Sequence, residues 1–109
     1  MLPKKNRINL KNLNNFLLIK PQKIKKTPYF DLFIYQNNIL ENRCGVLLSK
    51  KIITKATQRN KIKRIIFSIV SKLSNQSKDF LFKPKPEILK INKNELKKII
   101  LLNLNQNNE

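Results

Sequence analysis

The stretch KIKRIIFSIVSKL, residues 61–73, carries the strongest helical pattern of this sequence. Its apolar residues recur at i, i+3, i+4, i+7, i+8 and i+11, which is the spacing of one face of an α-helix. This stripe consists of Ile62, Ile65, Ile66, Ile69, Val70 and Leu73. At about 100° per residue, the opposite side of the helix carries Asn60, Lys63, Arg64 and Phe67. Arg59 lies at the edge of the stripe. The pattern predicts an amphipathic helix with a buried stripe and a cationic face toward solvent.

The beginning of this helix belongs to a strongly basic segment, residues 49–64. The segment has no acidic residue and seven cations, which are Lys50, Lys51, Lys55, Arg59, Lys61, Lys63 and Arg64. A charge run is most often only a solvated face, but these cations alternate with the apolar stripe and are therefore held on a rigid element. Asn60 adds an amide that can contact a backbone or a base edge, and the first N–H groups of a helix attract phosphate. The segment favours recognition of folded RNA.

Residues 29–35 alternate in the manner of a β-strand. The two faces consist of Phe30, Leu32 and Ile34 on one side and of Tyr29, Asp31, Phe33 and Tyr35 on the other. Three aromatic residues on the second face leave two interpretations open. Either the strand is buried on both faces, or the second face is a surface on which unpaired bases lie.

Another strand is predicted over residues 43–49. It contains Gly45, the only glycine of the chain. Glycine weakens a strand, so a lone glycine there marks a bulge or a close approach of another backbone. By alternation, Gly45 shares a face with Leu47 and Ser49.

The remaining elements are shorter or weaker. Residues 10–19 have helical spacing, and the basic connector 20–28 has room for a short edge strand. A short apolar strand is predicted over 79–82. Asn92 to Glu95 has capping-box spacing and opens a last helix, which gives way to a polar tail from about residue 103.

Size and charge point to one domain with a polyanionic partner. The 109 residues suit a single core, and we expect residues 1–109 to form one domain. The 24 Lys and Arg face only 6 Asp and Glu, for a net charge of +18. Such an excess repels itself in the compact state unless a polyanion neutralises it, and nucleic acid is the leading candidate. An AT-rich codon bias explains the preference for Lys over Arg, but it does not explain the scarcity of acids.

Other protein classes are disfavoured by what the sequence lacks. It has no histidine, and its carboxylates are scattered singly, so we expect no catalytic residue and no metal site in the protein itself. The single cysteine, Cys44, lies in an apolar run, which indicates a core residue in a reducing compartment. We expect no signal peptide, because no apolar stretch follows the charged segment 4–7, and no membrane span, because no run of about 20 apolar residues is found in this sequence. The expected location is therefore the cytoplasm, without a membrane partner.

Two segments resemble the signature of the bacterial ribonuclease P protein: Ser49-Lys50-Lys51 and Arg59-Asn60-Lys61-Ile62-Lys63-Arg64. In that signature a Ser-Lys-Lys strand end precedes an Arg-Asn-Arg-x-Lys-Arg helix, and Lys61 here replaces one arginine. The flanking segments resemble the same family in the same order, at residues 1–7, 43–46, 79–86 and 94–96. The resemblance covers nearly the whole chain.

The resemblance implies an α+β fold, an α/β sandwich of order αβββαβα with a four-stranded central sheet, of the type of ribosomal protein S5 domain 2. It also implies a left-handed crossover through the basic helix, against the usual right-handed rule. Proteins of this family are accessory subunits of a ribonucleoprotein endonuclease that matures the tRNA 5′ end. The implied partners are its catalytic RNA and the 5′ leader of precursor tRNA, with no obligate protein partner. The implied cofactor is Mg²⁺, which acts with the catalytic RNA and has no site encoded in the protein.

The resemblance also implies two sets of RNA contacts. The interface with RNA is expected at Lys50, Lys51, Lys55, Arg59, Asn60, Lys61, Lys63 and Arg64. The cleft for the leader is expected at Phe33, Gly45 and Ser49. One departure is Phe67, which stands where many members have another arginine, so that end of the contact is expected to be weaker or partly apolar.

Three rival functions fit the sequence less well. A ribosomal or other structural RNA-binding protein agrees with the composition, but it would leave cleavage of precursor tRNA unchanged. A basic membrane-surface protein needs an exposed apolar face, whereas the predicted strands and helices bury theirs. A protein-only nuclease needs the histidines or clustered acids that are absent.

Overall fold

The computed structural model of the chain describes residues 6–8 and 20–105. Its strands are β1 (Lys23–Lys26), β2 (Phe30–Gln36), β3 (Arg43–Val46) and β4 (Lys78–Pro84). Its helices are α2 (Ala56–Ser71), the short 3-10 helix η3 (Pro86–Lys90) and α3 (Lys93–Asn105). The helix predicted over residues 10–19 lies outside the described residues.

The strands form one mixed sheet of order β1-β2-β4-β3. β2 pairs antiparallel with β1 and β4, whereas β3 pairs parallel with β4. Parallel neighbours cannot be joined by a tight turn, so the chain crosses from β3 to β4 through α2. The predicted α+β class with a four-stranded sheet is confirmed, and the left-handed sense of the crossover stays a prediction.

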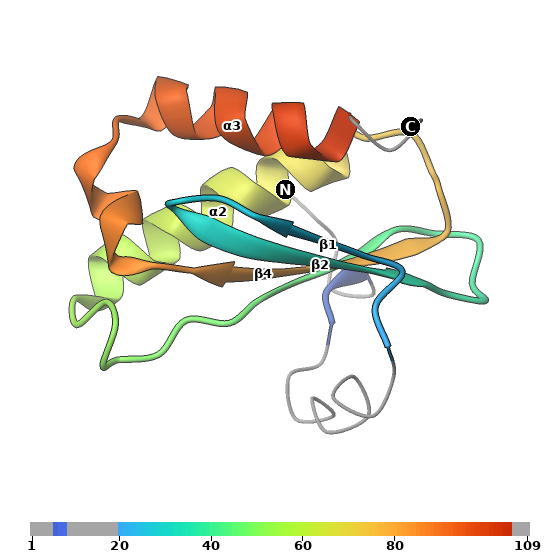
Figure 1. Cartoon of the computed structure of the whole chain (residues 1–109), viewed down its shortest axis with the longest axis horizontal. Helices are drawn as coiled ribbons and strands as arrows, with labels where there is room; N and C mark the ends of the chain where they lie inside the picture. Colours follow the sequence, from blue (N-terminus) through green and yellow to red (C-terminus); the bar gives the residue numbers. More distant parts are fainter. Residues whose placement is uncertain (1–5, 9–19, 106–109) are drawn as a thin grey trace.

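α2 and α3 cover the same face of this sheet, as Figure 1 shows. The core lies between them and the sheet. Phe30, Leu32 and Ile34 of β2 are fully buried there, as the alternation predicts, and burial of such a side chain stabilises the fold by roughly 1.5–3 kcal/mol. The rings of Phe30 and Phe82 lie 5.5 Å apart between their centroids. Cys44 is also fully buried, which raises the pKa of its thiol and confirms its place in the core.

Both long helices that the sequence predicts are present, with their apolar faces turned toward the core. The apolar stripe of α2 faces the sheet, and Ile66 at its centre is fully buried. At the start of α3 the backbone N–H of Glu95 donates to Oδ1 of Asn92 at 2.8 Å, so the predicted capping interaction is confirmed. In the part of the chain that the structure describes, no helix is long and apolar enough to cross a membrane.

β3 is shorter than predicted. It ends at Val46, and only the backbone N–H of Leu47 continues the ladder, by donating to the Phe82 carbonyl at 2.8 Å. The prediction that the strand reaches residue 49 is wrong, because the chain turns at Ser49 to enter the loop before α2.

The predicted polar tail begins later than residue 103. α3 continues to Asn105 because Leu104 is only 1% exposed against the core. In addition, the Lys25 ammonium of β1 donates to the carbonyl of Asn103. Two contacts with the body of the protein therefore hold the last helical turn in place.

Candidate nucleic-acid interface

The loop between β3 and α2 presents two of the predicted RNA contacts. The Ser49 carbonyl accepts hydrogen bonds from the backbone N–H groups of Ile52 at 3.2 Å and Ile53 at 3.1 Å. Ser49 Oγ also accepts from the N–H of Ile52, at 3.2 Å. Ile53 is 1% exposed and anchors the loop in the core. The resulting turn holds Lys50 and Lys51 at its tip, where both are exposed.

Arg59 faces this loop from the first turns of α2. Its Nη1 donates to the carbonyls of Ile53 and Thr54, each at 2.8 Å. Hydrogen bonds from a charged donor are stronger than those between neutral groups. Arg59 therefore ties the loop to the helix, a role that the prediction of an RNA contact did not include.

The N-terminus of α2 is strongly positive. Lys55 occupies the N-cap position, where Ser, Thr, Asp or Asn is preferred, and it makes no side-chain capping hydrogen bond. The first turn has no acidic residue, although the helix dipole favours negative charge at this end. An incoming phosphate would gain from the dipole, from the first N–H groups and from the exposed Lys55 together.

One flank of α2 carries Asn60, Lys63 and Arg64 around a hollow of about 330 Å³. Phe67 also lines this hollow, and the Arg7 guanidinium carbon lies 5.2 Å from the centroid of its ring. This distance permits a cation–π interaction. We predicted Phe67 on the solvent side of the helix, and this is wrong: Phe67 is 9% exposed, because it belongs to the hydrophobic core cluster and Arg7 lies over its ring. We call this side the Arg7 flank.

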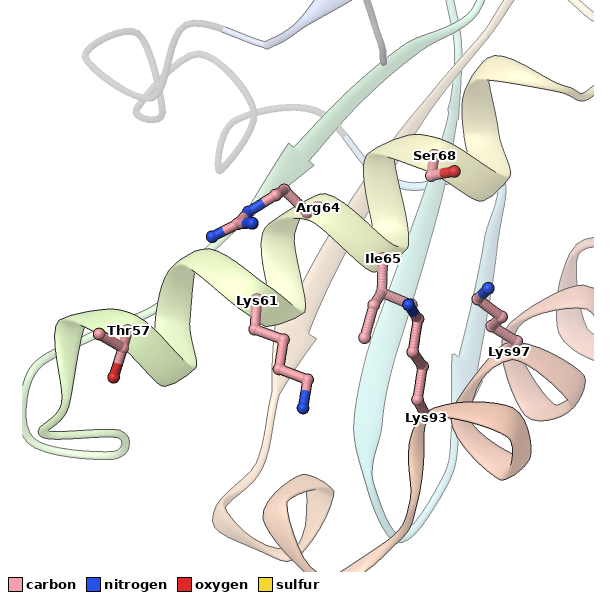
Figure 2. Close-up of a pocket in the computed structure, with 7 residues that line it drawn as sticks. All are labelled: Thr57, Lys61, Arg64, Ile65, Ser68, Lys93 and Lys97. Carbon is pink, nitrogen blue, oxygen red and sulfur yellow. The ribbon is translucent and has the colours of Figure 1, made fainter.

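The other flank of α2 turns toward α3 (Figure 2). There Lys61 lines a groove together with lysines of α3, and Arg64 borders both the groove and the hollow of the Arg7 flank. Asn60 and Lys63 thus lie on one flank and Lys61 on the other. The structure therefore distributes the predicted RNA contacts of α2 over two flanks.

The predicted leader cleft lies on the sheet face that is turned away from α2 and α3, which we call the second face. The strand register places Phe33 of β2 opposite Leu81 of β4 and Leu81 opposite Gly45 of β3. Residues directly opposite each other share a face, so the three form one row. Phe33 is half-buried, whereas Leu81 is 3% exposed. Because Phe33 is half-buried while Tyr35 on the same face is only 7% exposed, both interpretations of the aromatic face stay open.

Gly45 is required by a close approach. A Cβ atom at this position would lie 3.1 Å from Cβ of Ile8 and 3.1 Å from Cδ1 of Leu81. The N–H of Ile8 donates to the Cys44 carbonyl at 2.8 Å and brings residues 6–8 alongside β3. The close approach predicted from the lone glycine is confirmed. Ile8 covers this end of the second face, while Ser49, the third predicted cleft residue, lies exposed in its turn beyond the end of β3.

The register also places on the second face residues that the sequence pattern missed. Ile24 of β1 lies opposite Phe33 and is 51% exposed. Lys26 and Lys83 lie on either side of Asp31, and both are exposed. The alternation of apolar and polar residues within one strand does not show which strands pair with it. The sequence pattern therefore could not place these residues on the same face as Phe33. Together they give the second face an apolar centre with cations beside it, the combination that binds single-stranded RNA.

The two acidic residues of the sheet are paired with cations. Arg43 Nε and Nη2 donate to the two carboxylate oxygens of Asp79 at 2.7 and 2.6 Å, and this hydrogen bonding raises the pKa of Arg43. Lys85 Nζ lies 3.1 Å from Oδ1 of Asp31. Across residues 6–8 and 20–105, no three His, Cys, Asp or Glu side chains are placed together to hold a metal ion.

These features define a class of protein: a small, basic α+β protein whose longest helix and second sheet face are suited to a polyanionic chain. The comparisons with known proteins narrow this class. The family model described as Ribonuclease P matches residues 2–106. Because that match spans nearly the whole sequence, the chain belongs to the ribonuclease P protein family.

Individual relatives agree with this assignment. The ribonuclease P protein component of Blochmanniella pennsylvanica (strain BPEN) is 42% identical over 67 residues, a match that covers 60% of this chain and 56% of the relative. The RNase P protein of Staphylococcus aureus has a similar structure, with a TM-score of 0.71 and 25% identity over 85% of this chain and 86% of that one. The RNase P protein of Thermotoga maritima gives a TM-score of 0.69 and 28% identity over 90% of this chain and 93% of that one.

Proposed function

We propose that this chain is the protein subunit of a bacterial ribonuclease P. In this role it binds the catalytic RNA and the 5′ leader of precursor tRNA, and it assists the endonucleolytic removal of the leader that gives the mature tRNA 5′ end. Membership of the ribonuclease P family supports the proposal. The observation that carries it is the acid-free segment 49–64, whose seven cations lie on a fixed turn and on the first half of α2.

The catalytic RNA is proposed to contact the loop and α2. The exposed cations there are Lys50, Lys51, Lys55, Lys61 and Arg64, with Lys63 half-buried beside them. Each phosphate that such a cation neutralises releases condensed counterions, so affinity falls steeply as salt rises. Asn60 is exposed and supplies an uncharged donor and acceptor among them. Arg59 contributes mainly by holding the loop in place.

The leader is proposed to lie on the second face of the sheet. Phe33 and the exposed Ile24 offer an apolar surface for an unpaired base, and Lys26 and Lys83 lie within the same face for its phosphates. Stacking of a base on an aromatic ring contributes roughly 1–3 kcal/mol and tolerates any base. Leaders of different sequence are therefore accommodated by one surface.

Bond cleavage in this proposal belongs to the RNA, which acts with Mg²⁺. Asp79 and Asp31 are already paired with Arg43 and Lys85, and neither belongs to a cluster of potential metal ligands. The protein supplies positive charge that lowers the repulsion between two RNA chains. Less Mg²⁺ is then needed to bring substrate and catalyst together. The corresponding location is the cytoplasm, without a membrane or an obligate protein partner.

Reconstitution with the cognate catalytic RNA tests this function. At low Mg²⁺, the protein should raise kcat/KM for a precursor tRNA with a long leader more than for one with a single-nucleotide leader. A lysine oligomer of equal charge serves as the control for charge alone. If neither the cleavage rate nor leader affinity changes, the proposal is wrong, and binding to RNA without such a change would instead indicate a structural RNA-binding protein.

A further inference from the structure

A groove of about 480 Å³ separates α2 from α3. Thr57, Lys61 and Ser68 line it from α2, and Lys93 and Lys97 line it from α3. Figure 2 shows that Lys93 and Lys97 extend from α3 toward α2, while Lys61 extends from α2 on the same side. Neither lysine of α3 belongs to the basic segment at residues 49–64. The groove therefore gathers cations from two elements that are far apart in the sequence.

The protein itself gains little from these cations. Within the described residues, no carboxylate forms an ion pair with Lys61, Lys93 or Lys97. Lys93 and Lys97 stand at i and i+4 of one helix, where like charges are destabilising, and Lys93 is the first residue of α3, where the helix dipole disfavours a cation. Glu95, the acid of this helix turn, accepts a hydrogen bond from Nδ2 of Asn92 at 3.3 Å. An anion in the groove would relieve the repulsion between Lys93 and Lys97 and the unfavourable interaction of Lys93 with the helix dipole.

The shape of the groove indicates a chain of phosphates. Thr57 and Ser68 are eleven positions apart on α2, which corresponds to about 16 Å along a helix and is much longer than one phosphate. Their hydroxyls can donate to phosphate oxygens at the two ends. Ile65, which is 6% exposed, supplies an apolar wall between them. Low dielectric beside this wall strengthens the attraction between lysine and phosphate.

We propose that the groove between α2 and α3 is a second RNA-backbone site, in which Lys61, Lys93 and Lys97 bind phosphates of the catalytic RNA. The inference rests on the proposed function and adds α3 to the interface. RNA then contacts α2 on both sides, along the Arg7 flank and along this groove, with Arg64 between them.

The double variant Lys93→Gln/Lys97→Gln tests the groove. Its matched control is Lys90→Gln/Lys98→Gln, which removes the same charge from exposed lysines of η3 and α3 that do not line the groove. Binding to the cognate catalytic RNA is measured over a range of salt concentrations. The groove variant should bind about tenfold more weakly and reduce the slope of log K against log salt by about one to two, whereas the control should change affinity by about twofold or less.

A second pair of variants leaves the lysines intact. Ser68→Glu places a negative charge in the groove, and Ser71→Glu places one on the exposed surface of the same helix. Only Ser68→Glu should weaken RNA binding strongly. Thermal melting verifies that each variant folds. If either groove variant matches its control while Asn60→Ala/Lys63→Gln loses affinity, the groove is not an RNA site and the proposed function stands. If the unaltered protein does not bind the catalytic RNA, it is the proposed function that fails.

Discussion

Arg59 and Arg64 lie five residues apart on α2 and differ in what their guanidinium groups contact. Arg59 is half-buried, and its Nη1 is committed to the carbonyls of Ile53 and Thr54. Arg64 is exposed at the border between the two flanks of the helix. One arginine therefore shapes the proposed RNA-binding surface, and the other is proposed to form part of it.

Replacing each arginine with alanine should separate these roles. In urea denaturation without RNA, Arg59→Ala should lower the free energy of unfolding by about 1–2 kcal/mol, because two hydrogen bonds from a charged donor are lost at a partly exposed site. Arg64→Ala should stay within about 0.5 kcal/mol, as is usual for an exposed position. Both variants should bind the catalytic RNA more weakly. Equal stability of the two proteins would contradict the role of Arg59 in holding the loop.

Within the proposed leader surface, Phe33 is the residue whose replacement we expect to have the largest effect. Phe33→Ala should weaken binding of a precursor tRNA with a leader by about tenfold, since a stacked base contributes roughly 1–3 kcal/mol. Affinity for mature tRNA, which has no leader, should not change. Phe33→Tyr keeps the ring and should bind like the unaltered protein. A similar loss for precursor and mature tRNA would show that Phe33 acts through the fold and not through the leader.

At the scale of elements, β3 and β4 are joined by a side-chain pair as well as by their backbones. Asp79 is 3% exposed and accepts two hydrogen bonds from Arg43 and a third from Nδ2 of Asn37 at 2.9 Å. Asn37 Nδ2 also donates to the Glu41 carbonyl. The pair therefore fixes both the pairing of the two strands and the loop that leads into β3.

The variant Asp79→Asn should destabilise the protein by about 2–4 kcal/mol, because it leaves the Arg43 charge partly buried without its partner. Asp31→Asn is the matched control: the Lys85 side chain that it pairs with is 38% exposed, so the loss should be about 1 kcal/mol or less. Chemical denaturation monitored by circular dichroism measures both. A smaller effect for Asp79→Asn than for the control would contradict this assignment.

The elements that could be predicted from the sequence are those whose pattern is local. The stripe of α2 and the buried face of β2 follow from spacing alone, and both are confirmed. The order of the strands could not be predicted in this way, because the residue pattern within β4 does not show which strands lie beside it. η3 was not predicted, because a helix of five residues is too short to show a periodic apolar pattern.

The candidate site was predicted unevenly for the same reason. A helical wheel finds the cations of α2, but it cannot show that Lys61 faces α3 or that Arg59 bonds to the preceding loop. Phe67 was placed in solvent because the wheel contains no information about Arg7, which lies sixty residues earlier and covers the ring. Contacts between distant segments account for each of these differences.

For the whole molecule, a net charge of +18 makes salt act in opposite directions on folding and on binding. Raising NaCl from about 10 mM to about 300 mM should raise the melting temperature of the free protein, because shorter Debye lengths weaken the repulsion among its cations. The same change should lower the affinity for RNA. Thermal melting and RNA titration over one salt series measure both. A melting temperature that falls with salt would show that self-repulsion does not limit the stability of this fold.

The position of β4 has a consequence for the timing of folding during synthesis. β4 lies between β2 and β3 in the sheet but is the last strand to leave the ribosome. Until residue 84 has emerged, β3 lacks its sheet neighbour β4, and β1 with β2 forms only a two-stranded hairpin, which is marginally stable by itself. Pairing then joins residues as distant as Cys44 and Phe80, and long-range parallel pairing is slow. The growing chain thus exposes its whole basic segment to the RNA of the ribosome before β4 can complete the sheet.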